Sequence, residues 1–187
     1  KAFDAAADGY GRGEGAGVLV LKRLSDAQRD GDPIWCVIRG TAINHNGTSN
    51  GLVAPSPQAQ AEVVREAWRR AGARPAEAAY VEAHGTGTAL GDPLEAEALG
   101  VVFGQGRPAE DPLLIGAVKA NIGHTETAAG AAGLIKVALS MHHRTIPPLA
   151  GFREPNPLIH FDEWKLRVPV EAVPWPDGRP LAGTFTV

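Results

Sequence analysis

Two hydrophobic periodicities alternate along the chain, and each predicts a different secondary structure. Short apolar runs rich in β-branched and aromatic residues predict strands, whereas apolar residues three or four positions apart predict helices. Strands are predicted at residues 18–24, 34–43, 78–83 and 113–118, near 165–170 and at 182–187. Helices are predicted at residues 58–71, about 93–102 and 125–144. Because strands alternate with helices, the pattern predicts an α/β fold with a largely parallel sheet.

Composition places the chain among soluble globular proteins and excludes several function classes. Its 187 residues suffice for one domain or part of a larger one, and its 44% hydrophobic and 21% charged residues are ordinary fractions. The net charge is −3 and no basic run occurs, which argues against a nucleic acid partner. No apolar run is long enough to span a membrane. One cysteine excludes an internal disulfide and fits a cytoplasmic location.

Both ends of the chain look like the interior of a longer sequence. The chain opens at Lys1 without a signal peptide and stops at Val187 within a strand-like run. We therefore expect a piece of a larger protein.

The sequence HGTGT, residues 84–88, lies between a predicted strand and a predicted helix. In α/β sheets, ligands bind beyond the carboxyl ends of the strands. Glycine permits tight turns and a close approach to the backbone, and histidine exchanges protons near neutral pH. The pattern therefore indicates either a reacting group in a narrow slot or a plain turn.

The residues after HGTGT have two interpretations. Asp92 suits a helix N-cap, Pro93 suits the first helical position, and Glu95 lies where a capping-box acid falls. Capping explains both acids, but Asp92 is also a candidate site residue.

A third motif, KANIGHTETAAG at residues 119–130, places Lys119 at the end of a strand and His124 before a helix rich in small residues. A helix N-terminus disfavours a protonated imidazole, so a neutral His124 can donate a hydrogen bond to a developing oxyanion. The alternative is a hydrogen-bonded structural histidine. Because His84 and His124 both follow strands and precede helices, we expect them to meet in one pocket, with Lys119 as an orienting or positive group.

The other features indicate structural roles. Cys36 lies within an apolar strand pattern and is expected in the core. The glycine-rich residues 9–17 lack the spacing of a nucleotide-binding loop and are expected to form a turn, as are residues 44–51. No spacing of cysteine and histidine indicates a metal site.

The chain resembles the β-ketoacyl synthase domain of type I polyketide synthases, in the thiolase superfamily, through HGTGT, GDPLEAEAL and KANIGHTETAAG in this order. Further matches are FDAAADGYGRGEGAGVLVLKRL, GTAINHNGTSNGLVAPS and RTIPPLAGFREPNP. The resemblance spans nearly the whole chain but only about the C-terminal half of such a domain. It implies a thiolase-like αβαβα architecture, with residues 1–32 ending the N-terminal half and residues 33–187 belonging to the C-terminal half.

The resemblance also implies a decarboxylative Claisen condensation by an acyltransferase. An acyl thioester is joined to a malonyl-type extender, which the phosphopantetheine arm of an acyl carrier protein holds. His84, His124 and Lys119 match the catalytic positions, and Thr86 and Thr88 match the threonines that contact the arm. The chain itself is expected to bind no cofactor.

The family's nucleophilic cysteine lies N-terminal to this segment, and Cys36 matches no catalytic position. The chain alone is therefore expected to be incomplete. Its expected partners are the missing N-terminal part that carries the cysteine, the acyl carrier protein, and a second copy in a homodimer of the full domain. A decarboxylase or transacylase variant and a non-catalytic structural partner are the alternatives. The half by itself is expected to be poorly soluble.

Overall fold

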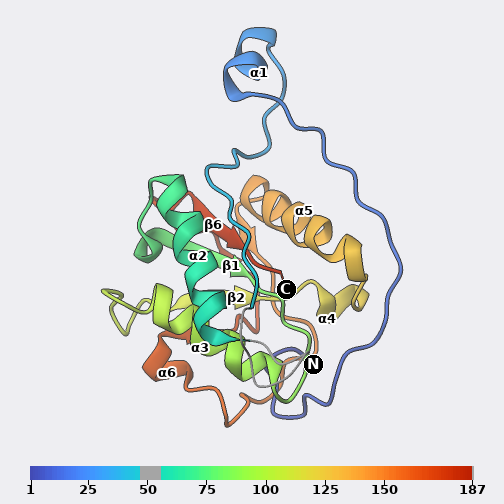
Figure 1. The fold of residues 1–187 in the computed structure, drawn as a ribbon, viewed down its shortest axis with the longest axis vertical. Helices are drawn as coiled ribbons and strands as arrows, with labels where there is room; N and C mark the ends of the chain where they lie inside the picture. The colour runs from blue at the N-terminus through green and yellow to red at the C-terminus, as the bar shows by residue number, and fades with distance from the viewer. Residues whose placement is uncertain (47–55, 187) are drawn as a thin grey trace.

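A four-stranded parallel sheet forms the centre of the computed structural model, which describes residues 1–46 and 56–186 (Figure 1). The strands follow the order β4, β2, β1, β6, and every neighbouring pair is parallel. Their bounds are Ala78–Glu82 for β1, Leu113–Gly116 for β2, Leu166–Arg167 for β4 and Leu181–Thr184 for β6. The expected α/β fold with a parallel sheet is confirmed.

Helices cover both faces of this sheet (Figure 1). Helices α2 (Pro57–Ala71) and α3 (Gly91–Phe103) pack on one face, and α5 (Ala129–His142) packs on the other. Val81 in β1 contributes to the core on the α2 and α3 side, whereas its neighbour Tyr80 contributes to the core under α5. Every residue of β1 is buried, as expected for a parallel strand covered on both faces.

Small residues explain how closely α5 approaches the sheet. A β-carbon added at Gly133 would lie 3.3 Å from Cγ of Glu82 and 3.1 Å from the hydroxyl of Thr184, which is tighter than ordinary packing. Glycine therefore lets the helix pack closely at the point where it crosses the ends of β1 and β6.

The shorter elements complete the fold. Helix α4 (Lys119–Ile122) and the 3₁₀ turn η2 (Glu126–Ala128) precede α5, so the helix predicted at residues 125–144 begins later than expected. Strand β2 ends at Gly116, and Lys119 begins α4 rather than ending a strand. The remaining elements are η1 (Pro75–Glu77), α6 (Phe161–Trp164), and an antiparallel pair, β3 (Thr145–Ile146) with β5 (Val173–Pro174).

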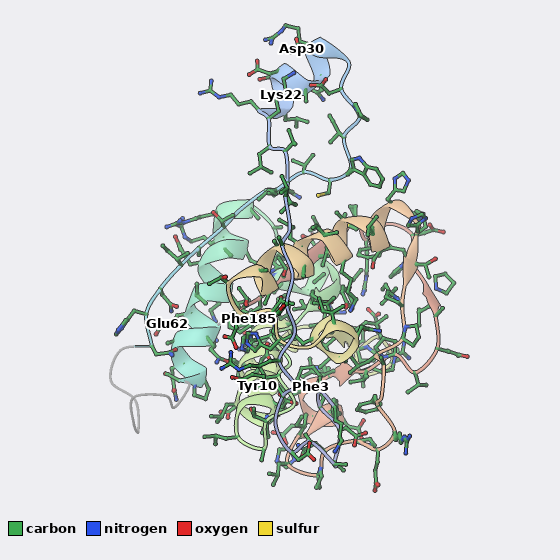
Figure 2. All side chains as sticks on the ribbon, turned by 90° about the vertical axis from the view of Figure 1, so that its right-hand side faces the viewer. Phe3, Tyr10, Lys22, Asp30, Glu62 and Phe185 are labelled. Carbon is green, nitrogen blue, oxygen red and sulfur yellow. The ribbon has the colours of Figure 1, made fainter. Side chains whose placement is uncertain are left out.

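The strands predicted at residues 18–24 and 34–43 are wrong. Both segments are irregular and exposed, and Val18 and Val20 are 87% and 94% accessible. Helix α1 (Leu24–Asp30) joins them, and Figure 2 shows Lys22 and Asp30 standing away from the body. A strand forms where a neighbour supplies hydrogen bonds and a layer covers its side chains. Within the described residues, neither segment has such a neighbour.

Two further expectations concern residues in or directly after the second of these segments. Cys36 is half-buried in an irregular stretch rather than within a core strand, so the predicted core position is wrong. The turn predicted at residues 44–51 lies mostly outside the described residues.

In the part of the chain that the structure describes, no helix has both the length and the apolar character that a membrane crossing requires.

Candidate active site

His84 lies directly after β1, and a buried glutamate holds the loop that begins there. The backbone N–H groups of His84 and Gly85 donate to the two carboxylate oxygens of Glu95, at 2.6 and 2.8 Å. Glu95 projects from α3 and is 3% exposed. One carboxylate therefore fixes the direction in which the chain leaves the sheet.

Asp92 holds the other end of the same loop. Its carboxylate accepts a hydrogen bond from the backbone N–H of Gly87 at 2.9 Å and another from that of Phe3 at 2.6 Å. The side chain is fully buried. Asp92 therefore ties the histidine loop to the N-terminal segment of the chain.

The capping interpretation of these two acids is wrong. Helix α3 begins at Gly91, before Asp92, and the hydroxyl of Thr88 accepts the Gly91 N–H at 3.0 Å. Asp92 and Glu95 lie inside the helix and face the preceding loop. Their spacing is that of a capping box, but the donors they satisfy belong to other segments.

The two glycines of HGTGT are required by geometry. Gly85 and Gly87 have φ angles of 47° and 77°, in the left-handed region that favours glycine. A β-carbon at Gly85 would also collide with the side chain of Ala117. The loop therefore takes a shape that brings it against the turn after β2.

His124 lies opposite His84, and their ring centroids are 5.4 Å apart in an edge-to-face arrangement. The backbone N–H of Glu126 donates to Nδ1 of His124 at 2.9 Å. Because Nδ1 accepts this bond, a neutral His124 carries its proton on Nε2. The local backbone thus selects the tautomer that can donate a hydrogen bond from Nε2.

Lys119 joins the two histidine loops. Its Nζ donates to the carbonyl oxygen of His84 at 2.7 Å, and the side chain is buried. Burial lowers the pKa of Lys119, while the carboxylates of Glu95 and Glu82 act in the opposite direction. The cation therefore lies beside the histidine pair and among acids that favour its charged form.

The surroundings keep both histidines neutral. Burial, followed by the charge of Lys119, lowers the pKa of His84 to about 3. The same two causes, in the same order, lower the pKa of His124. Two neutral imidazoles beside one buried cation form a group suited to receiving negative charge on a bound molecule.

Thr86 and Thr88 lie next to this group on the same loop. Their hydroxyl oxygens are 3.2 Å apart, and both side chains are partly buried. The structure therefore brings His84, Thr86 and Thr88 on one loop close to Lys119, at the start of α4, and to His124, which follows α4. Asp92 accepts a hydrogen bond from Gly87 of the first loop.

Sequence reasoning missed two contributors to this site. The sequence pattern explains Glu95 only as a cap, whereas in the structure it accepts the N–H of His84, 11 residues earlier in the chain. The ring of Tyr10 lies 5.0 Å from that of His124, and no local pattern indicated this contact. The glycine-rich residues 9–17, expected to form a turn, instead run beside His124, with the His124 N–H donating to the Gly11 carbonyl at 2.8 Å.

Another histidine, His142, lies apart from this site. His142 ends α5, and its ring centroid lies 4.4 Å from that of Trp35. Among the described residues, no group of three or more histidine, cysteine, aspartate or glutamate side chains has the geometry to hold a metal ion.

Two family models match this chain. Residues 35–153 match the beta-ketoacyl synthase, C-terminal domain, and residues 1–27 match the beta-ketoacyl synthase, N-terminal domain. One subunit of the phenolphthiocerol/phthiocerol polyketide synthase of Mycobacterium tuberculosis is 58% identical over 94% of the chain. The 5-methyl-1-naphthoate synthase of Streptomyces sahachiroi is 52% identical over 95% of it. The chain spans only 9% and 10% of these relatives, respectively.

Solved structures agree with these matches. The ketosynthase from module 6 of the bacillaene synthase of Bacillus subtilis aligns with a TM-score of 0.89 and 47% identity, over 95% of this chain and 32% of its own. An oxazolomycin ketosynthase domain of Streptomyces albus aligns with a TM-score of 0.82 and 40% identity, over 93% and 30%. These alignments confirm the expected thiolase-like fold class.

Proposed function

Because the chain belongs to the β-ketoacyl synthase family, we propose that it supplies the histidine and lysine part of a polyketide ketosynthase site. The complete site is an acyltransferase that lengthens an acyl thioester by decarboxylative Claisen condensation. The observation that carries this proposal is the pair of neutral imidazoles, His84 and His124, at a ring separation of 5.4 Å.

The proposed reaction has two substrates. A cysteine in the N-terminal part of the domain carries the acyl group as a thioester, and an acyl carrier protein presents a malonyl-type extender on its phosphopantetheine arm. The bond between C2 of the extender and its carboxylate breaks, and carbon dioxide leaves. C2 then bonds to the acyl carbon, the cysteine thiolate departs, and a β-ketoacyl thioester remains on the carrier protein.

His84 and His124 act on the charge that this sequence creates. Loss of carbon dioxide places negative charge on the thioester oxygen of the extender. Hydrogen-bond donors fixed beside that oxygen stabilise the charge without having to reorganise. Because the Glu126 N–H donates to Nδ1 of His124, the proton of the neutral ring lies on Nε2, which can donate to the thioester oxygen. The lowered pKa of His124 favours this neutral form.

The surrounding residues position the two histidines and place positive charge beside them. Lys119 fixes the carbonyl of His84 and adds positive charge, while Glu95 and Asp92 hold the two ends of the histidine loop. Thr86 and Thr88 provide hydroxyls beside the histidines, which suits hydrogen bonding to the amides of a phosphopantetheine arm. The arm belongs to the carrier protein, so the chain itself holds no cofactor in this proposal.

The proposed partners follow from the incomplete site. They are the N-terminal ketosynthase part that bears the cysteine, with residues 1–32 of this chain as its end, and the acyl carrier protein. The complete domain acts as a homodimer in the cytoplasm.

A complete domain that joins this chain to its N-terminal part tests the proposal. Mass spectrometry follows three events: acyl transfer to the cysteine, loss of carbon dioxide from malonyl carrier protein, and formation of the β-ketoacyl product. All three are expected. Decarboxylation without condensation would favour the decarboxylase variant, and none of the three would favour a structural partner. Comparing denatured and native masses shows whether the two parts share one polypeptide.

The rate of malonyl decarboxylation is expected to show no acid limb near the ordinary histidine pKa of about 6.5. The pKa of His84 is depressed to about 3, so its neutral donor form persists as the pH falls from 8 to 5. A histidine of ordinary pKa would keep only about 3% of its neutral form at pH 5. The measurement is kcat/KM between pH 5 and 8, which reports the free enzyme.

The same profile in Glu95→Gln serves as the control, because burial raises the pKa of Glu95 to about 7. A step near pH 7 that disappears in this variant belongs to Glu95. A step near pH 6.5 that persists in both proteins would contradict a neutral His84.

A further inference from the structure

A second buried polar cluster, formed by Tyr80, Glu82 and Lys136, lies behind the histidine loop, and the proposed chemistry gives it no direct role beyond the charge of Glu82 near Lys119. Glu82 is the last residue of β1 and is 1% exposed. One of its carboxylate oxygens accepts a hydrogen bond from the Tyr80 hydroxyl at 2.5 Å and forms an ion pair with the Lys136 ammonium at 2.7 Å. Lys136 also donates to the Tyr80 hydroxyl at 2.9 Å.

The other carboxylate oxygen of Glu82 contacts the segment that leads to Lys119 and His124. It accepts the backbone N–H of Val118, the residue before Lys119. Glu82 itself lies two residues before His84 in the chain. A single carboxylate therefore connects the strand that leads into one loop with the backbone that leads into the other.

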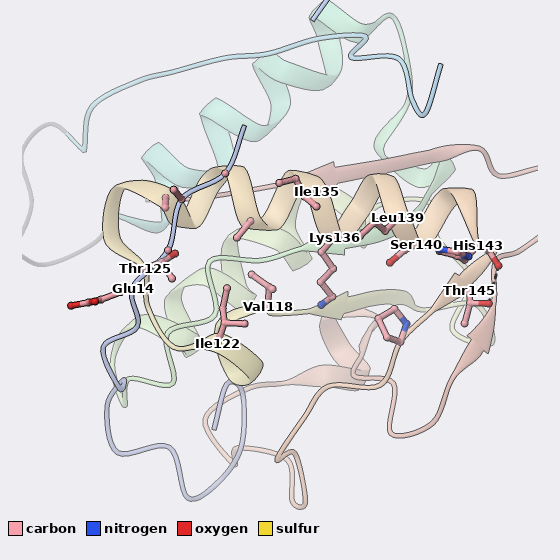
Figure 3. Close-up of a pocket in the computed structure, with 16 residues that line it drawn as sticks. Glu14, Val118, Ile122, Thr125, Ile135, Lys136, Leu139, Ser140, His143 and Thr145 are labelled. Atoms are coloured by element: carbon pink, nitrogen blue, oxygen red, sulfur yellow. Dashed lines mark hydrogen bonds between the residues drawn. The ribbon is translucent and has the colours of Figure 1, made fainter. Parts of the chain in front are cut away.

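Lys136 is the counter-charge that makes this arrangement stable. A buried carboxylate is costly unless it is paired and hydrogen-bonded. Figure 3 shows Lys136 reaching from α5 toward the sheet, where its ammonium meets Glu82. Burial and the charge of Glu82 raise the pKa of Tyr80, so its hydroxyl stays protonated and donates. The cluster thus fastens α5 to the ends of β1 and β2.

Close packing leaves this cluster little freedom. A β-carbon at Gly116, the last residue of β2, would collide with the Tyr80 hydroxyl. The Tyr80 hydroxyl, which donates to Glu82, therefore packs directly against the end of β2, and the other oxygen of the same carboxylate accepts the Val118 N–H.

We propose that Glu82 and Lys136 are positioning residues that keep the His84 loop and the segment from Val118 to Lys119 in a fixed position relative to each other. The proposal rests on the proposed function, because this relative position matters for catalysis only if the two segments act on one substrate. Displacements of about 1 Å in a catalytic group can lower a rate by about a hundredfold. A cluster that fixes two loops from behind is suited to preventing such displacements.

The test compares Glu82→Gln, Lys136→Met and the double variant in the complete domain. Methionine suits the site because Lys136 borders a largely apolar cavity of about 610 Å³ between residues 14–17 and α5. Each single variant is expected to lower kcat for malonyl decarboxylation by about 10–100-fold, while KM changes by less than about twofold. The double variant removes both charges and is expected to recover about tenfold over Lys136→Met.

A matched control comes from the opposite end of β1. Arg107 is also buried, and its guanidinium donates to the carbonyl of Ala78, the first residue of β1, at 2.7 Å. Arg107→Met is expected to lower stability comparably and to leave kcat unchanged. An equal loss of kcat in Arg107→Met would overturn the proposal, because general destabilisation would then explain the effect.

Hydrogen exchange provides a readout that needs no activity. Lys136→Met is expected to speed amide exchange in residues 83–88 and 117–124, but not in residues 96–103 of α3. Unchanged exchange in both loops would overturn the proposal, even if the enzyme were active. If the wild-type domain showed no decarboxylation, the proposed function would fail, and exchange would still decide the positioning role. If Lys136→Met folds poorly, Lys136→Arg serves as the second variant. Because arginine retains the charge, kcat and amide exchange are both expected to return toward their wild-type values.

Discussion

Alanine in place of His84 or His124 is expected to lower the rate of malonyl decarboxylation by about 10²–10³-fold in the complete domain. Each substitution removes one neutral hydrogen-bond donor from a pair whose ring centroids are 5.4 Å apart. The effect should appear in kcat, because the charge develops only in the transition state. Release of carbon dioxide from malonyl carrier protein measures it.

The double variant should lose little more than the worse single variant, because donors that act as one unit are not additive. His142→Ala is the matched control, since His142 is an exposed histidine at the end of α5. It is expected to keep full activity. Full activity in a folded His84→Ala or His124→Ala domain would refute the proposed roles of the pair.

Alanine in place of Asp92 is expected to lower the free energy of unfolding by about 2–4 kcal/mol. The carboxylate accepts the backbone N–H groups of Phe3 and Gly87, and it is fully buried. Its removal leaves two buried donors without an acceptor. Chemical denaturation of the complete domain measures the loss.

Asp92→Asn retains one oxygen acceptor and should lose about half as much stability. Glu97→Ala, on the same helix but partly exposed, is the control and should change stability by less than about 0.5 kcal/mol. If Asp92→Ala were as stable as Glu97→Ala, the two hydrogen bonds would not be holding the loop.

The candidate site was largely predictable because its signals are local. HGTGT and the motif around His124 each join a strand to a helix, and parallel strands direct such loops to one edge of a sheet. This rule predicts that His84, His124 and Lys119 lie together, and in the structure they do. The neutral state of His124 was also expected, although the structure attributes it chiefly to burial and the charge of Lys119.

The predictions that failed depended on distant partners. Asp92 and Glu95 have the spacing of helix caps, but their carboxylates satisfy donors on the preceding loop and, for Asp92, on Phe3. Residues 18–24 and 34–43 have strand-like composition, but within the described chain no strand pairs with them. Sequence spacing specifies which conformation is favoured locally, and it does not specify which neighbour is present.

The sequence by itself determined the α/β class, the central helices and strands, and the identity of the two histidine loops, because periodicity and turn chemistry are properties of neighbouring residues. The tertiary structure alone decided that Glu95 and Asp92 hold the His84 loop and that Glu126 selects the tautomer of His124. It also decided that Glu82 connects two strands to α5. Each of these contacts requires a hydrogen-bond geometry that forms only after the chain has folded.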